Sequence, residues 1–263
     1  MKKAVCIAAL IGLSAPAFAG EVFNQGFESD TAGWFDSSNG WYGGVNRVAS
    51  GTDGISSASG SYHAQFTQSS DTGGFTRFDG YRDNWSGPYQ ASVAIYLDTS
   101  WAAGEGFDYS VASSTSSGDH LRDFIFHVAM DSSTGELLVG GSNNTNFEPR
   151  EDLDTINHAV ITDSGWYTFE HSFFEAGDGS LAVALNLYDA GGNLIFQEIR
   201  NNAGDLVGSV AGGNRYGWFN NIDIAGGINV DDVMLNVVPL PPAALAGLGM
   251  LAGFAGVRKL RQR

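Results

Sequence analysis

The sequence predicts an all-β protein folded as a single β-sandwich. Short segments in which apolar and polar residues alternate recur along the chain, as in strands with one buried face. Turn-forming residues fill the spaces between these segments, and the chain holds 36 glycines. We find no long amphipathic helix, no internal repeat and no linker. Many short strands separated by turns are typical of a sandwich or barrel, and the length suits one domain.

The clearest strand candidate covers residues 89–97, where apolar and polar residues alternate over the whole segment. The strongest hairpin prediction is centred on residues 189–193 (DAGGN), because this turn sequence joins two alternating segments. Residues 143–154 are polar and contain a proline, so they predict an exposed loop. In chain order, the predicted strands are residues 62–66, 89–97, 124–130, 166–173, 181–187, 194–199 and 228–237.

Residues 1–19 have the organisation of a secretory signal peptide. Two lysines precede an apolar run that ends in the small-x-small sequence AFA, which predicts cleavage before Gly20 and export of the chain. The single cysteine, Cys6, lies in this segment, so the mature protein forms no disulfide. A domain of residues 20–237 is large enough to be stable through its own core.

Residues 238–263 form a second segment of unusual composition. Prolines open it and prevent a preceding strand from continuing. The uncharged run 243–257 would be about 22 Å long as a helix, shorter than the roughly 30 Å hydrocarbon core of a bilayer. A basic end favours the cytoplasmic side. The Pro motif comprises Val238, Pro239, Leu240 and Pro241, and the basic tail contains Arg258, Lys259, Arg261 and Arg263.

This three-part tail resembles the sorting signal of PEP-CTERM exported bacterial proteins, in its VPLPA variant. The doubled Pro241-Pro242 departs from that motif and leaves the cleavage position open. The resemblance implies an exosortase-type membrane transpeptidase as a partner and a transient stay at the inner membrane. The destination would then be the cell surface or a polysaccharide-rich extracellular matrix, as in biofilms. An ordinary C-terminal membrane anchor is the alternative interpretation.

Residues 20–237 also resemble known sandwich domains. FNQGFESDTAGW (23–34), ASGSYHAQF (58–66) and INVDDVMLNV (228–237) are similar to the opening and closing parts of jelly-roll carbohydrate-binding modules. GWYTFEHSFF (165–174) and LAVALNLYDAGGNLIF (181–196) resemble concanavalin A-like sandwiches. These similarities imply a jelly-roll or concanavalin A-like sandwich and extracellular polysaccharide as a partner.

The jelly-roll resemblance also implies a structural calcium ion. In those modules a Glu after the first Phe and an Asp on the closing strand approach one calcium, which here corresponds to Glu28 and Asp232. Hard carboxylate oxygens suit calcium. Neighbouring residues of a strand point to opposite faces, so we expect only one of Asp231 and Asp232 to bind the ion. Surface acids without a metal are the alternative.

The net charge of the chain indicates which classes of partner are possible. Without its two terminal segments the chain has seven cations, all Arg, against 29 acids, hence a formal net charge of −22. Phosphate backbones would be repelled, so nucleic acid is a poor partner and none is predicted. Acidic loops favour hydration and divalent cations instead.

Aromatic residues are the candidates for ligand contact. Exposed rings offer flat apolar faces to the C–H surfaces of sugars. Trp166 and Trp218 lie in strand patterns and are predicted to fill the core. The residues predicted to contact carbohydrate are Trp41, Tyr42, Trp85 and Tyr89.

Catalysis has less support in the sequence. The acids of residues 148–154 form the densest carboxylate cluster, but their polar loop suggests a solvated edge or a weak calcium loop. His127 and His171 lie within strand patterns and are predicted to be partly buried. No Ser nucleophile elbow is present. The prediction is therefore a non-catalytic, polysaccharide-binding surface protein. The alternatives are a polysaccharide hydrolase or lyase, and a purely structural surface protein.

Overall fold

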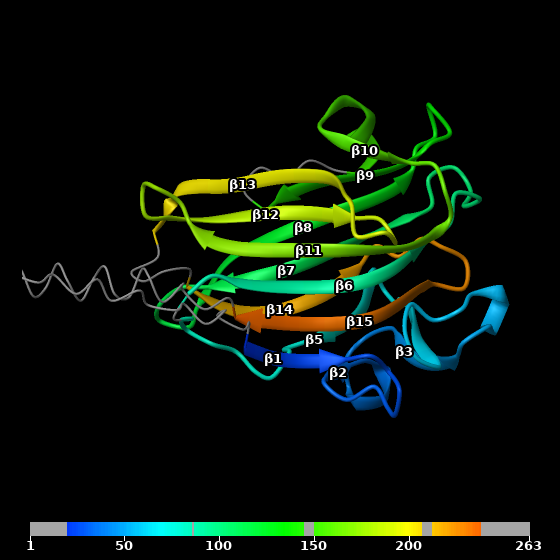
Figure 1. Cartoon of the computed structure of the whole chain (residues 1–263), viewed down its shortest axis with the longest axis horizontal. Coiled ribbons are helices and arrows are strands. Elements are labelled where there is room, and N and C mark those ends of the chain that lie inside the picture. Colours follow the sequence, from blue (N-terminus) through cyan, green and yellow to red (C-terminus); the bar gives the residue numbers. More distant parts are fainter. Residues whose placement is uncertain (1–19, 86, 145–149, 207–211, 238–263) are drawn as a thin grey trace, which may run out of the picture.

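The computed structural model describes residues 20–237 except 86, 145–149 and 207–211 (Figure 1). These residues form two antiparallel sheets that pack face to face, so the all-β sandwich prediction is confirmed. The predicted signal peptide and sorting signal lie outside the described residues. Within the described part of the chain, no helix has the length and apolar character needed to cross a bilayer.

One sheet has eight strands in the order β13-β12-β11-β6-β15-β4-β3, with β1 paired to β15. In Figure 1 the blue β1 lies directly beside the orange β15, so the first and last strands of the domain are neighbours. The strands are β1 (Gly20–Gln25), β3 (Gly44–Ala49), β4 (Tyr62–Thr67), β6 (Tyr89–Leu97), β11 (Gly165–Glu175), β12 (Ser180–Tyr188), β13 (Leu194–Leu206) and β15 (Ile228–Val237).

The other sheet has seven strands in the order β10-β9-β8-β7-β14-β5-β2. Its strands are β2 (Trp34–Phe35), β5 (Thr72–Thr76), β7 (Gly106–Ser114), β8 (His120–Met130), β9 (Leu137–Asn143), β10 (His158–Ile161) and β14 (Gly213–Asn220). Three short 3₁₀ segments complete the described structure, namely η1 (Ser37–Asn39), η2 (Thr52–Gly54) and η3 (Arg150–Thr155).

Every strand predicted from alternation is present. The segment 89–97 is β6, and the predicted hairpin is β12 and β13, closed by a hydrogen bond from the Asp189 amide to the Asn193 carbonyl (3.0 Å). The pattern did not reveal the strands β1, β2, β3, β5, β7, β9, β10 and β14. In β9 (LLVGGSN) and β14 (GNRYGWFN) glycines and polar residues interrupt the alternation, so no periodic signal remains.

Aromatic rings from both sheets fill the space between them. Phe66 and Phe219 lie 5.0 Å apart, and Phe107 contacts Phe169 across the sandwich at 6.2 Å. All four side chains are fully buried, and burying one Phe stabilises a fold by about 1.5–3 kcal/mol. Tyr89 belongs to this core, and the prediction that it contacts carbohydrate is therefore wrong.

The position of Tyr89 follows from the direction of alternate residues on β6. Its ring is fully buried and stacks on Phe173 at 4.3 Å, and its hydroxyl donates to the Gly213 carbonyl (2.9 Å). For Trp166 and Trp218 the error is the opposite one, because the sequence predicted that they are buried in the core. Their neighbours in sequence point into the core, so both tryptophans lie on outer sheet faces and are half-buried. The prediction that they fill the core is wrong.

Of residues 143–154, for which the sequence predicts an exposed loop, residues 145–149 lie outside the described part of the chain, and some of the others are buried. Asn143 is buried in β9, and the fully buried Leu153 of η3 packs beside Leu138 and Ala129. Because Gly140 has no side chain, the methyl groups of Leu153 can approach its backbone. The η3 segment therefore covers part of the outer face of the seven-stranded sheet.

Candidate functional site

A row of aromatic side chains lies on the outer face of the seven-stranded sheet, where β2, β5 and β14 run side by side. Phe35 and Phe75 are cross-strand partners with ring centroids 5.8 Å apart, and Phe75 contacts Tyr216 at 5.4 Å. Loops on either side add further rings. We refer to the set as the aromatic strip, which consists of Phe35, Trp41, Tyr42, Phe75, Tyr81 and Tyr216.

Trp41 and Tyr42 reach the strip from the loop after η1. Trp41 packs on Phe75 at 4.9 Å, and its indole N–H donates to the Gly73 carbonyl (3.1 Å). Tyr42 contacts the Trp41 ring edge-on at 5.6 Å and is 49% exposed. Gly43 follows with a φ of 69°, and a Cβ there would lie 2.2 Å from a backbone oxygen, so only glycine allows this close turn. The loop therefore presents both rings in a defined orientation.

Arg77 lies among three rings of the strip. Its guanidinium carbon is 5.2 Å from the Phe35 ring centroid, 5.9 Å from that of Phe75 and 5.1 Å from that of Tyr81. These contacts are cation–π interactions, and the Arg77 side chain remains exposed. Arg215 approaches the same Tyr81 ring at 4.6 Å. Two cations therefore flank one exposed tyrosine.

Polar groups surround the Tyr216 end of the strip. The Tyr216 hydroxyl donates to Asp123 (2.8 Å), and His120 stacks beside the Tyr216 ring at 6.1 Å. Burial and the Asp123 charge raise the pKa of Tyr216 well above its usual value, so its phenol stays protonated. Asp123 also accepts from the side-chain amide of Asn144 (3.0 Å). This end offers donors and acceptors beside apolar ring faces.

The four residues predicted to contact carbohydrate therefore do not lie at one site. Trp41 and Tyr42 lie together on the aromatic strip. Trp85 is on a loop, as predicted, but it is half-buried, packs against the core and lies 6.1 Å from Tyr89. Phe75 gave no local signal, and Tyr216 stood out only as an aromatic residue in glycine-rich sequence, because only the pairing of β5 with β14 brings the two together.

A groove of about 390 Å³ lies on the outer face of the eight-stranded sheet. We refer to it as the Trp166 groove. Small residues such as Ser92 and Ala94 of β6 line it, and the Trp166 indole donates to the Ser56 carbonyl (2.7 Å). Its volume is within the range of small-ligand pockets. The lining residues are Ala58, Ser92, Ala94, Trp166, Thr168, Asp189, Ala190, Gly192, Asp232 and Met234.

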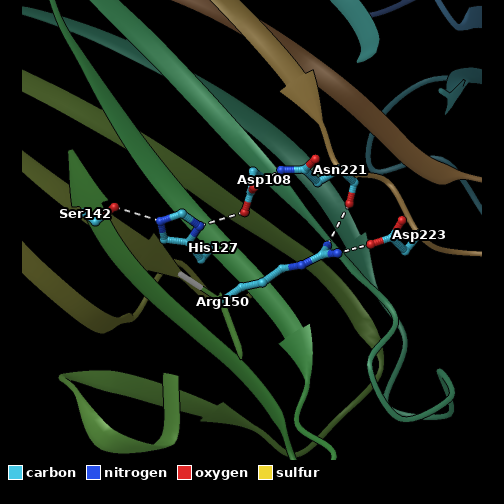
Figure 2. Close-up of polar contacts among 6 residues, drawn as sticks. All are labelled: Asp108, His127, Ser142, Arg150, Asn221 and Asp223. Carbon is cyan, nitrogen blue, oxygen red and sulfur yellow. Dashed lines mark hydrogen bonds and ion pairs between the residues drawn. The ribbon is translucent and has the colours of Figure 1, made fainter. Parts of the chain in front are cut away.

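Ser142, His127 and Asp108 form a hydrogen-bonded array on the outer face of the seven-stranded sheet (Figure 2). His127 Nε2 lies 2.7 Å from Ser142 Oγ, and Nδ1 lies 2.6 Å from an Asp108 oxygen. Asn221 donates its side-chain amide to the second Asp108 oxygen (2.6 Å), and Arg150 donates to the Asn221 carbonyl (2.7 Å). Arg150 also forms an ion pair with Asp223. The array therefore connects three strands with η3 and the β14–β15 loop.

The order Ser–His–Asp resembles that of a hydrolase triad, but its surroundings differ. The Ser142 and His127 side chains are fully buried, and Asp108 is 3% exposed. Asp108 lies opposite His127 in the β7–β8 ladder, and β9 brings Ser142 alongside. This placement depends on the register of three strands, which the sequence did not reveal. A buried serine has no access to a substrate and cannot act as a nucleophile. In this structure the array therefore serves to connect the strands.

Glu28 and Asp232, the predicted calcium ligands, meet on one segment near the start of β4. Glu28 accepts from the backbone amides of Ser61 (2.9 Å) and Tyr62 (3.0 Å), and Asp232 accepts from the Ser59 hydroxyl (2.7 Å). Their proximity follows from the pairing of β1 with β15. Hard oxygen donors are thus present. Among the described residues no group of three or more acidic, His or Cys side chains is placed to hold a metal, so carbonyl and water oxygens would have to complete a calcium site.

Asp231 and Asp232 do not point to opposite faces, as strict alternation predicts. A bulge interrupts β15 at this point, and Asp232 has a φ of 47°. Both carboxylates consequently contact Ser59, because Asp231 accepts from its backbone amide (3.2 Å). Burial raises the pKa of Asp231 to about 6, and the neighbouring Asp232 charge adds to this effect. Arg47 lies nearby and donates to the Phe27 carbonyl (2.7 Å).

The chain matches no family model and no curated protein. Among solved structures, it is similar to the conserved carbohydrate esterase of the Shiga toxin-encoding bacteriophage phi24B, with 13% identity and a TM-score of 0.52 over 84% of this chain and 100% of that one. It is also similar to the CBM2 module of the evolved Dit of Lactobacillus casei BL23 phage J-1, with 13% identity and a TM-score of 0.49 over 86% and 99%.

A third similar structure is the lectin from Bauhinia forficata in complex with GalNAc, with 10% identity and a TM-score of 0.41 over 82% of this chain and 98% of the lectin. At these identities the likeness concerns the fold. The chain is therefore a two-sheet β-sandwich that shares its fold with the esterase structure, in agreement with the predicted sandwich class.

Proposed function

We propose that this chain is an exported, non-catalytic β-sandwich that binds polysaccharide through the aromatic strip. The observation that carries the proposal is a series of contacting rings, from the exposed Tyr42 through the half-buried Trp41 to the half-buried Tyr216, with the buried Phe75 packed between the last two. Sugar rings stack their C–H faces on such surfaces, while Arg77 and Asp123 can bond hydroxyl groups. The strip crosses three strands, which suits an extended polymer.

The Trp166 groove is a weaker candidate for a polymer. Its single large ring lies beside small side chains and has the dimensions of a site for one small molecule. Trp166 therefore provides a control for Trp41, since both are half-buried tryptophans on outer sheet faces.

A binding experiment with the mature exported protein tests the proposal. Retention on a panel of matrix polysaccharides is measured for the native protein and for Trp41→Ala, Tyr42→Ala and Trp166→Ala. We expect Trp41→Ala to weaken binding by about tenfold or more, because a ring at the centre of the contact is lost, and Trp166→Ala to bind normally. Loss of polysaccharide binding in Trp166→Ala alone would assign binding to the Trp166 groove. Failure of the native protein to bind any glycan would contradict the proposal and favour a purely structural surface protein.

We also propose that the two terminal segments direct export and sorting. The tail resemblance supports an exosortase-type transpeptidase as the partner that removes residues beyond the Pro motif, after a transient stay at the inner membrane. The protein would then lie at the cell surface or in the extracellular matrix. Mass spectrometry of the protein from cells with and without an exosortase tests this. Loss of the tail only when the exosortase is present is expected, and an intact tail in both would favour a permanent anchor.

Hydrolysis of a polysaccharide or of its ester groups is the second candidate function. The Ser142–His127–Asp108 array favours it, because the two hydrogen bonds of 2.7 and 2.6 Å match the contacts of a nucleophile, a base and an orienting acid. Burial of the serine argues against it. Product release from a bound glycan that disappears in Ser142→Ala, with the fold retained, would establish the enzymatic alternative.

A further inference from the structure

Arg77 differs from the other six arginines of residues 20–237 in what its guanidinium contacts. Arg82 pairs with Asp79, Arg150 with Asp223 and Arg200 with Glu198, while Arg47, Arg122 and Arg215 donate to carbonyl or amide oxygens. Within the described part of the chain, the Arg77 guanidinium contacts only aromatic rings. Its N–H donors are therefore available to an external acceptor.

The absence of an ion pair at Arg77 is notable because acids are abundant. The seven arginines of this region face 29 carboxylates, yet the acids nearest in sequence and on the strip have other partners. Asp79 pairs with Arg82 at 2.8 Å. Asp36 accepts from the Ser38 and Val45 amides (2.9 and 3.1 Å). The strip thus keeps an unneutralised cation on an acidic protein.

The backbone around Arg77 fixes where this cation lies. Arg77 directly follows β5, and its carbonyl accepts from the Gly80 amide (2.9 Å) in a turn. The next residue, Phe78, is buried in the core and held by a hydrogen bond from its amide to the Thr76 hydroxyl (2.9 Å). The backbone at Arg77 is therefore fixed, and the ring contacts of the guanidinium restrict its position before any ligand arrives, which reduces the entropy lost on binding.

We infer that the polysaccharide bound by the aromatic strip is anionic, and that Arg77 is the residue that selects it. This inference rests on the proposed function. A carboxylate of a uronic acid or a sulfate ester presents paired oxygens that a guanidinium binds with two parallel N–H donors. Phe35 and Tyr81 contact the guanidinium with ring centroids 5.2 and 5.1 Å from its carbon, and Arg215 beside Tyr81 adds positive potential. A neutral sugar would leave this charge without a counterpart.

The negative charge of the rest of the protein should confine an anionic polymer to the aromatic strip. That charge repels an anionic polymer from other surfaces and directs it to the strip. Salt screens both this repulsion and the attraction at Arg77. The native protein should therefore lose affinity for the anionic polymer more steeply with salt than a variant that lacks Arg77.

Matched polymers test the inference on the mature protein. The native protein, Arg77→Gln, Arg77→Lys and Arg82→Gln are titrated with a polyuronate, with the same polymer methyl-esterified, and with a sulfated glycan. We expect the native protein to prefer the anionic polymers. We expect Arg77→Gln to lose about tenfold or more of that affinity, and its binding to the esterified polymer to stay unchanged. Arg82→Gln, a neighbour already paired with Asp79, serves as the control and should bind normally.

Each outcome has a distinct meaning. Tighter binding of the polyuronate than of the sulfated glycan identifies a carboxylate as the recognised group, and the reverse order identifies a sulfate. Arg77→Lys, which keeps the charge, should recover part of the affinity if the variant is folded. Equal affinity of the native protein for both forms of the polyuronate, unchanged in Arg77→Gln, would overturn the inference and leave polysaccharide binding intact. Loss of every polymer from the native protein would reject the proposed function itself.

Discussion

At the scale of single residues, burial determines the chemistry of His171. Its side chain is fully buried, Nε2 donates to the Phe124 carbonyl (3.0 Å), and the rings of Phe126 and Tyr109 pack around it at 5.0 and 5.4 Å. Loss of water lowers the pKa of His171 to about 3. The histidine is therefore neutral in the folded protein and more deeply buried than the sequence predicts.

His171 should make the protein less stable in acid. The ordinary pKa of 6.5 applies to the unfolded chain and about 3 to the folded one. The unfolded chain therefore gains a proton first as the pH falls below 6.5. At about 1.4 kcal/mol per unit, this costs at most about 5 kcal/mol of stability by pH 3. In His171→Phe this loss should be absent, so its stability relative to the native protein should increase steadily below pH 6.5. Denaturant unfolding at several pH values measures this difference, and parallel profiles would contradict it.

Ser142 tests whether the buried array is structural. Ser142→Ala removes the hydroxyl that contacts His127 Nε2 in a buried site, so we expect unfolding to become easier by about 1–3 kcal/mol. Polysaccharide binding should not change. Ser116→Ala, at an exposed turn position, is the control and should alter stability by less than about 0.5 kcal/mol. Equal stability of both variants, measured by urea unfolding, would mean that the array contributes nothing to the fold.

At the scale of elements, η3 shows how an irregular segment becomes part of the sandwich. Leu153 is its buried contact, so Leu153→Ala should destabilise the protein by about 2–4 kcal/mol. Leu194→Ala makes the same change at a side chain that is 49% exposed, and little effect is expected there. Thermal unfolding of the two variants compares them directly. A similarly small decrease in melting temperature in both variants would show that η3 is not packed on the sheet.

Strand prediction succeeded where one face of a strand is apolar and the other polar. β6 and β12 kept their predicted bounds closely, whereas β13 begins at the predicted Leu194 but runs to Leu206 instead of Ile199. β9 was missed although β12, which is also buried on both faces, was found. In β12 large apolar residues alternate with small or polar ones, and that contrast shows the strand. In β9 two adjacent glycines remove the contrast, and Gly140 has no side chain where Leu153 of η3 packs against it.

At the scale of the whole molecule, the neighbouring first and last strands offer a place for the proposed calcium ion. The carboxylates of Glu28, Asp231 and Asp232 each contact the segment from Ser59 to Tyr62, with Arg47 as a nearby cation, but they are not grouped closely enough to bind a metal by themselves. Calcium would offset this excess of negative charge and hold the two strands together. We expect calcium to raise the melting temperature of the native protein and not that of Asp232→Asn. An identical melting temperature with calcium and with a chelator would exclude the ion.

The candidate site could be predicted only in part. Trp41 and Tyr42 were found because they lie between glycines in a loop, where a ring has no strand partner to cover it. Tyr89 was assigned to the surface in error, since its position on β6 does not reveal which face turns inward. Phe75 and Arg77 gave no local signal. Their role appears only when β5 lies between β2 and β14.

The sequence by itself determined the all-β class, the clearest strands and turns, and the strongly acidic charge, because each depends on residues close together in the chain or on composition alone. The tertiary structure decided which strands are neighbours, which faces meet in the core, and where η3 covers the sheet. Those features depend on contacts between residues distant in sequence, and local periodicity does not report such contacts. The unpaired Arg77 among aromatic rings is one such feature, and the proposed specificity for an anionic polysaccharide depends on it.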